Sequence, residues 1–277
     1  MKSKKISVEK QIQKNKIKSF LLLAGVFAVI ILIGYLISFA FSPQYFFIIM
    51  LLSSIFALLY ILLLYSNCEK IALRSVNARE ASKDKFRVLH EIVEKIASRS
   101  GIPKPKIFIM PGEQINAFAT GRNPKKAVIC VTEGCIKKLN KEELEGVIAH
   151  EISHIKNYDV KYMTIVAVVV GAVSIFSQLF LRSLWFSDNR KEGSSLLFLI
   201  AIVLAIVAPI VVMLMQFAIS RKREFIADAS AAGFVGSHGL ISALRKIKED
   251  EASMKVPQAM RSLFFRDTSK KISNIFA

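Results

Sequence analysis

Residues 19–68 read SFLLLAGVFAVIILIGYLISFAFSPQYFFIIMLLSSIFALLYILLLYSNC and contain no charged residue and no histidine. A soluble protein cannot expose such a stretch, whereas a helix of about 20 apolar residues is long enough to cross a bilayer. The segment Ser42-Pro43-Gln44 interrupts the stretch, as expected for a tight turn. The sequence therefore predicts a hairpin of two membrane spans, Phe20–Phe41 and Tyr45–Tyr65.

Two later stretches predict a third and a fourth span, Tyr162–Leu181 and Leu196–Ile219, with a kink at Pro209 in the fourth. The fold class expected is an α-helical membrane protein of four spans with an α+β domain. The predicted segments are a basic tail (1–19), the first hairpin (20–65), a domain segment (66–161), the second hairpin (162–219) and a second domain segment (220–277).

The distribution of positive charge predicts the orientation of these spans. The chain has 39 Lys and Arg against 21 Asp and Glu, and only Arg182, Arg190 and Lys191 lie in the connection 182–194. By the positive-inside rule, both termini and the domain face the cytoplasm of a multi-pass protein of the cell membrane. Anionic lipid of the bilayer then accounts for the net charge of +18. A basic stripe with interleaved aromatic residues is missing from the sequence, so no nucleic-acid partner is expected.

Outside the spans, the residue pattern predicts an α+β domain made from two segments. Cys68–Ser100 is expected to be helical, and three strands are expected at Lys106–Met110, Ile115–Thr120 and Ala127–Val131. Asn140 and Glu143 form a capping-box pattern that opens a helix over Lys141–Tyr158. Further helices are expected at Arg221–Ala232 and Leu240–Lys248. The cysteines Cys68, Cys130 and Cys135 lack a CxxC spacing, which disfavours a disulfide framework.

The predicted helix Lys141–Tyr158 carries His150-Glu151-Ile152-Ser153-His154. Two histidines at positions i and i+4 lie on one face of a helix, where both imidazoles can bind one metal ion. Glu151 lies beside that position and can act as a general base on water. Because HExxH also occurs by chance on solvated helices, the motif needs a third ligand to become specific.

Glu224 is the candidate for that third ligand. Exactly two predicted spans separate it from His154, so topology returns it to the same side of the membrane. Asp228, one helical turn later, could orient a ligand histidine through its free ring nitrogen. The alternative is that Glu224 forms an ordinary ion pair within the basic cluster around it.

In combination, these motifs resemble the HtpX family of membrane zinc metalloproteases, relatives of the CAAX prenyl endopeptidases. The resemblance rests on HEISHIKNYD, on SRKREFIADASA after a pair of spans, and on the strand NAFATG at Asn116–Gly121. It implies a zincin-like protease domain with one zinc ion, held by His150, His154 and Glu224, and Glu151 as the catalytic base. It also implies degradation of misfolded or damaged membrane proteins, as part of protein quality control and the stress response.

Three further features lie around this motif set. Asp159 matches the acid after the family's HExxH motif and could anchor Arg221 or Arg223, or form a simple ion pair at a helix end. His238 is expected at a loop or a helix start. Asp267–Ile272 stands where family members carry Thr-His-Pro-Pro, and it has neither histidine nor proline.

Asn116, Ala117, Phe118 and Ala119 are predicted to form an exposed strand beside the zinc helix. An extended peptide could pair with such a strand through main-chain hydrogen bonds, with little sequence preference. This arrangement would suit a protease whose partners are unfolded segments of many proteins.

Two alternatives to a membrane-surface protease remain at this stage. A metal-binding membrane scaffold without turnover would share the ligands, although it would tolerate the loss of Glu151. An intramembrane protease of the site-two type would carry HExxH within an apolar span. Here charged segments, 141–143 and 156–159, flank the motif, which disfavours that class.

Overall fold

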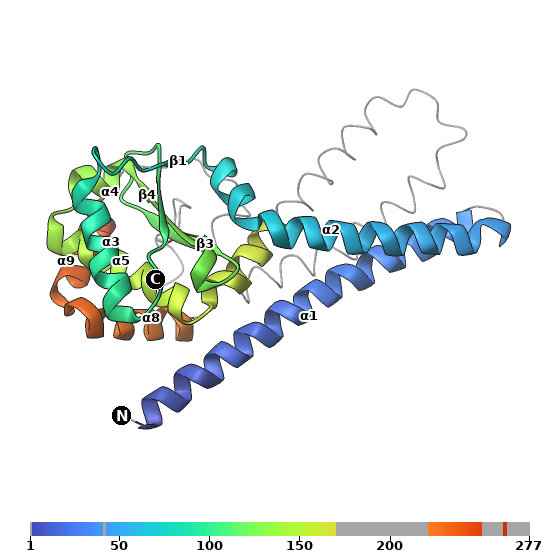
Figure 1. The fold of residues 1–277 in the computed structure, drawn as a ribbon, viewed down its shortest axis with the longest axis horizontal. Coiled ribbons are helices and arrows are strands. Elements are labelled where there is room, and N and C mark those ends of the chain that lie inside the picture. Colours follow the sequence, from blue (N-terminus) through green and yellow to red (C-terminus); the bar gives the residue numbers. More distant parts are fainter. Residues whose placement is uncertain (1, 41–42, 170–220, 251–262, 265–277) are drawn as a thin grey trace, which may run out of the picture.

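The structure is a computed structural model that describes the chain except residues 1, 41–42, 170–220, 251–262 and 265–277. It has two parts (Figure 1). A long hairpin, α1 (Lys2–Ala40) and α2 (Phe46–Ser75), points away from a mixed domain of strands and helices. A 3-10 turn, η1 (Pro43–Tyr45), lies between the two helices, at the interruption that the sequence indicates.

Both helices of the hairpin are long and apolar enough to cross a membrane, over Gln13–Leu32 and Phe46–Ser75. Only 11% of the most apolar window of α2 is buried, so this helix does not lie in the core of a soluble domain. Phe47 is 81% exposed, and Leu51 and Leu63 are also exposed. An apolar surface of this extent marks contact with lipid or with another protein.

The third and fourth predicted spans lie mostly outside the described residues. Residues 159–169, which include the start of the third span, are helical and largely buried. Ile165 and Val166 pack in one cluster with Leu22 of α1 and Leu64 of α2. The described part of the third span therefore lies against the hairpin.

The predicted basic tail differs from the structure in one respect. Residues 2–19 continue without a break into α1, and two polar side chains of this segment, Asn15 and Ser19, are buried. The burial of these two side chains is not predictable from the segment, because a lysine-rich sequence is typical of a solvated tail.

The prediction of a continuous helix over Cys68–Ser100 is wrong. Helix α2 ends at Ser75, a short strand β1 (Arg79–Glu80) follows, and α3 spans Arg87–Ser100. Asn77 has a positive φ of 53°, a conformation that asparagine tolerates better than most residues and that turns the chain out of α2. The first part of the predicted helix is the buried end of α2, and the last part forms α3.

Within the described residues, four strands form one sheet in the order β1-β2-β4-β3. Strands β2 (Lys106–Met110), β3 (Ala117–Gly121) and β4 (Ala127–Thr132) arise at the three predicted stretches, with small shifts at their ends. β2 and β4 are parallel, whereas β1 pairs with β2 and β3 pairs with β4 in antiparallel fashion. In the described part of the chain, β3 is therefore an edge strand.

Helix α5 (Lys141–Lys156) packs on this sheet. The predicted capping box is present: the Asn140 side chain accepts from the Glu143 N–H, and the Glu143 carboxylate accepts from the Asn140 N–H. Apolar residues on α5, including Val147 and Ile152, are fully buried against the strands and α3. The cap and this buried face together fix the position of the HExxH residues.

The described residues also form α4 (Glu133–Lys138), α8 (Arg221–Val235), α9 (His238–Glu249) and a 3-10 turn, η2 (Pro124–Lys126). Helices α8 and α9 pack on α5. Gly146 allows the backbones of α5 and α9 to meet, because a Cβ atom there would lie 2.5 Å from the Leu240 nitrogen. This close approach occurs one helical turn before His150.

Candidate metal centre

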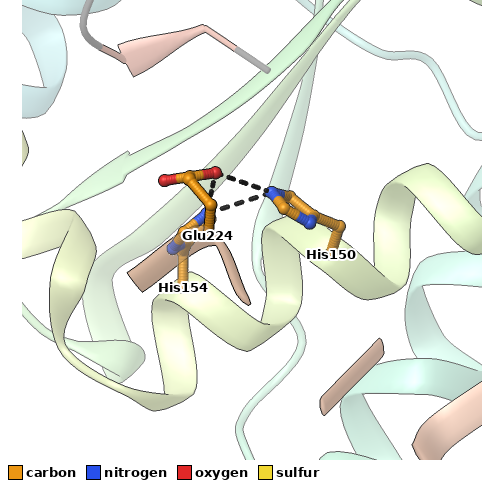
Figure 2. Close-up of side chains that lie close together, drawn as sticks. All are labelled: His150, His154 and Glu224. Carbon is orange, nitrogen blue, oxygen red and sulfur yellow. Dashed lines mark hydrogen bonds and ion pairs between the residues drawn. The ribbon is translucent and has the colours of Figure 1, made fainter. Parts of the chain in front are cut away.

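His150 and His154 lie one turn apart on α5, and their side chains point to the same place (Figure 2). Their Nε2 atoms are 3.1 Å apart, and their rings meet nearly edge to face. Both residues are buried, at 2% and 5% exposed. Two imidazole nitrogens this close in the protein interior form a ready pair of metal ligands.

Glu224 reaches the same point from α8, as Figure 2 shows. Its Oε2 atom lies 3.4 Å from His150 Nε2 and 3.6 Å from His154 Nε2. The three side chains form a group whose ligand atoms all lie within 4.8 Å of one another. The structure thus brings together the three residues that the sequence suggests as ligands, although Glu224 follows His154 by 70 residues (224 − 154) in the chain.

This donor set fits zinc in both chemistry and spacing. Two imidazoles and one carboxylate form the His₂Glu set of catalytic zinc sites, which keep a fourth position open. For tetrahedral ligands at about 2.0–2.2 Å from the ion, donor atoms are roughly 3.3–3.5 Å apart. The three separations here, 3.1, 3.4 and 3.6 Å, lie close to that range.

A carboxylate orients each histidine through its other ring nitrogen. Asp228 Oδ1 lies 2.9 Å from His150 Nδ1, and Asp159 Oδ2 lies 3.2 Å from His154 Nδ1. Such contacts fix the ring and place the proton on Nδ1, which leaves the Nε2 lone pair for a metal. The sequence suggested Arg221, Arg223 or a helix-end ion pair as partners of Asp159, but not this histidine.

The electrostatics of the group favour positive charge. Burial alone would lower the pKa of His154, but hydrogen bonds to Asp159 and Glu224 outweigh it and raise the pKa to about 10. The pKa of His150 is also raised, because its bonds to Asp228 and Glu224 outweigh burial. Burial would raise the pKa of Glu224, yet the two histidines hold it well below its usual range. A field that attracts protons this strongly also attracts a divalent cation.

Glu151 lies next to the ligand pair and is almost fully buried, at 2% exposed. Burial raises the pKa of this carboxyl group, against the lowering effect of the neighbouring histidines. The backbone N–H of Ala119 donates a hydrogen bond to the carboxylate. A raised pKa makes the carboxylate a stronger proton acceptor, which suits a general base.

The strand Asn116–Gly121 is beside α5 as predicted, but the prediction that it is exposed is wrong. Asn116, Ala117, Phe118 and Thr120 are 0% exposed, and Ala119 is 5% exposed. Its amides that do not pair with β4 already have partners: Ala117 donates to the Asn116 side chain, Ala119 to Glu151, and Gly121 to Thr164. The strand is an edge by sheet order, yet helical segments and the Phe264 ring cover it.

Two further residues lie close to the group: Asn15 had no role assigned from the sequence, whereas Arg223 was a predicted partner of Asp159, and the Asp159 carboxylate does act on its charge. Asn15 of α1 donates to Asp159, and Arg223 of α8 is buried, with its guanidinium 5.4 Å from the centre of the Tyr162 ring. Neither has a local sequence pattern, because each contact joins segments far apart in the chain. His238 is the first residue of α9 and is exposed, whereas Asp267–Ile272 lies outside the described residues.

Comparison with known proteins gives consistent matches. The family described as Peptidase family M48 matches residues 83–266, which include all the residues of the metal group. Proteins named "Protease HtpX homolog" are similar over most of the chain. The protein from Thermoanaerobacter pseudethanolicus is 40% identical over 273 residues, covering 95% of this chain and 91% of its own length.

A second homolog and a solved structure are also similar to this chain. The homolog from Caldanaerobacter subterraneus subsp. tengcongensis is 45% identical over 233 residues, covering 81% of this chain and 78% of its own length. Among solved structures, a crystal structure of S. mikatae Ste24p matches with a TM-score of 0.47 and 22% identity. That match covers 92% of this chain and 63% of the Ste24p chain.

Proposed function

This chain belongs to peptidase family M48 and is a metallopeptidase, and on that premise we propose that it is a zinc-dependent endopeptidase anchored in the cell membrane. The observation that carries the proposal is the convergence of His150, His154 and Glu224 at 3.1–3.6 Å, with Glu151 buried beside them. His150, His154 and Glu224 would hold one zinc ion. When bound, zinc polarises the scissile carbonyl and lowers the pKa of water toward about 7.

The residues of the chain supply the proton transfers. Glu151 takes a proton from the water whose oxygen attacks the peptide carbonyl carbon. It then gives this proton to the amine nitrogen as the carbon–nitrogen bond breaks. Asp228 and Asp159 keep the two histidine rings aligned during these steps, and the Ala119 N–H holds the Glu151 carboxylate until a peptide binds.

Membrane anchoring is supported by the exposed apolar hairpin of α1 and α2 and by the four uncharged stretches of the sequence. The positive charge of the domain supports a cytoplasmic active site. In this arrangement the substrates are unfolded or membrane proteins presented at the cytoplasmic surface of the bilayer.

Edge strand β3 supports recognition of extended peptides, with one condition that follows from its burial. A peptide that pairs with β3 must take the place of groups that now cover the strand. Ala119 would then exchange its bond to Glu151 for one to the peptide. Binding by main-chain hydrogen bonds would make sequence preference weak.

The test uses the full chain purified in detergent. Metal analysis should find about one zinc per chain, and an unfolded substrate such as casein should be cleaved at internal bonds. A chelator should abolish cleavage, and added zinc should restore it. Zinc binding without any cleavage of casein or of a membrane-protein substrate would instead favour the metal-binding scaffold.

A further inference from the structure

Helix α1 contacts the turn that follows the metal-binding helix. Asn15 Nδ2 lies 2.6 Å from Asp159 Oδ1 and 3.2 Å from the carbonyl oxygen of Asn157. These three residues are at most 2% exposed. A side-chain amide has two N–H groups and can donate to both oxygens at once. Because both partners are acceptors, the NH₂ group of Asn15 must face them.

Asp159 connects this contact to the metal centre. While Oδ1 accepts from Asn15, the other oxygen, Oδ2, lies 3.2 Å from His154 Nδ1. The opposite nitrogen of the same ring, Nε2, faces Glu224 and His150. An unbroken path of buried polar contacts thus runs from α1 to a ligand atom of the metal group.

The turn itself needs support from outside α5. Tyr158 has a positive φ of 59°, a left-handed conformation that is unfavourable for a residue with a bulky side chain. Lys16 Nζ lies 4.9 Å from the centre of the Tyr158 ring. Asn15 and Lys16 therefore contact three successive residues, 157 to 159, which are the residues that turn the Asp159 carboxylate back toward His154.

We propose that Asn15 is a positioning residue of the metal site. It holds Asp159 in the orientation that fixes the His154 ring, so that zinc affinity depends on the docking of α1. The inference rests on the proposed function, because it takes His154 as a zinc ligand. Since Gln13–Leu32 of the same helix is a candidate span, the position of the membrane hairpin and the affinity of the metal site become linked.

The experiment measures the zinc dissociation constant of the full chain in detergent by competition with a chelator. Loss of a direct partner of a ligand histidine typically weakens metal binding about 10–100-fold. Asn15 acts one contact further away, so Asn15→Ala should weaken zinc binding by about 5–10-fold. The matched control is Ser19→Ala. Ser19 is also buried on α1, but its hydroxyl donates to the Asn15 carbonyl oxygen and not to the turn, so its loss should leave zinc affinity within about twofold.

A double-mutant cycle separates positioning from a general loss of stability. In an Asp159→Asn background, Asn15→Ala should change the zinc dissociation constant by less than about twofold, because the path is already broken. If Asn15 only stabilised the fold, Asn15→Ala would weaken zinc binding by the same factor in the wild-type and the Asp159→Asn backgrounds. Thermal unfolding of the metal-free variants reports folding separately. Asn15→Asp provides a second variant of almost equal size, and its carboxylate would face Asp159 and weaken zinc binding more than Asn15→Ala does.

Each outcome decides between the two proposals. Wild-type zinc affinity in Asn15→Ala, or equal factors in both backgrounds of the cycle, overturns the positioning role and leaves the proposed function intact. Failure of the wild-type chain to bind zinc overturns the proposed function and this inference together.

Discussion

The backbone N–H of Ala119 in β3 donates to the carboxylate of Glu151 in α5. This bond joins the edge strand of the sheet to the acid of the HExxH motif. It helps to keep a buried carboxylate in one orientation beside the metal ligands, although burial disfavours its charge. The bond therefore holds Glu151 beside His150 and His154 in the orientation that the proposed mechanism requires.

Glu151→Gln should retain zinc and lose turnover. The substitution keeps the size of the side chain and leaves the ligands in place, but glutamine cannot take a proton from water. Removal of a general base typically costs about 10²–10⁴ in rate. Zinc content and kcat on an unfolded substrate should be measured together, with Glu142→Gln, an exposed acid on the same helix, as the control. A Glu151→Gln enzyme with normal kcat would exclude Glu151 as the base.

Glu224→Ala should remove most of the bound zinc. It leaves two imidazoles as protein ligands, one fewer than catalytic zinc sites use, and it removes the negative charge of the ligand set. The measurement is zinc per chain after dialysis against a weak chelator. Phe225→Ala is the control, because the neighbouring phenylalanine is 74% exposed on the same helix. Equal zinc content in Glu224→Ala and wild type would support the alternative of an ordinary ion pair.

Asp228→Asn should weaken zinc binding by about tenfold, the lower end of the range for such partners. Asparagine keeps a hydrogen-bond acceptor for His150 Nδ1 but loses the negative charge that makes the imidazole a stronger ligand. The side chain of Asp228 is 47% exposed, so the fold should tolerate the change. A chelator competition assay gives the affinity, and thermal unfolding of the metal-free protein checks the fold. Unchanged zinc affinity would mean that the hydrogen bond between Asp228 and His150 does not contribute to zinc binding.

Sequence reasoning works best where short-range patterns decide the structure. The capping box at Asn140 and Glu143 and the apolar face that follows predict α5 closely, ending two residues beyond the observed Lys156. Two histidines on one helical turn must point the same way, so their proximity follows from α5 alone. Glu224 comes close to the two histidines through the packing of α8 on α5. The sequence argument for its position was that two predicted spans separate it from His154.

Contacts between distant segments are what the sequence could not provide. Asn15 lies in a lysine-rich stretch that is typical of a solvated tail, yet it is buried against Asp159. The sequence of Asn116–Gly121 fits either an exposed edge strand or a covered one, and the outcome depends on contacts with Thr164 and Phe264. Burial of this kind depends on which helices pack against the sheet. The apolar periodicity within one helix or strand cannot predict such packing.

The predicted topology can be tested by thiol labelling in sealed cells. Ser75 is exposed at the end of α2, and a cysteine there should be protected from a reagent that does not cross membranes, as should one at Ser262. A cysteine at Ser187 or Ser194, in the connection with little positive charge, should be labelled. The three native cysteines are buried and should give little background. Labelling of Ser75→Cys from outside would contradict a cytoplasmic active site.

The last prediction concerns the C-terminal segment in which the family's histidine is missing. Leu263 and Phe264 are buried, and the Phe264 ring lies 5.0 Å from that of Phe118 in β3. Truncation after Arg266 keeps this contact. Removal of residues 267–277 should therefore leave zinc binding unchanged and at least a tenth of the activity, a limit of about 1.4 kcal/mol in barrier height.

Phe264→Ala is the matched comparison for that truncation, because deletion of a buried phenylalanine side chain typically costs about 3–5 kcal/mol. It should lower the Tm of the metal-free protein clearly, whereas the truncation should not. One missing donor to an oxyanion typically costs about 10²–10³ in rate. If the truncation loses activity by that factor while zinc stays bound, and a lysine restored at position 270 or 271 recovers it, then Lys270 or Lys271 replaces the family's histidine and the prediction is wrong.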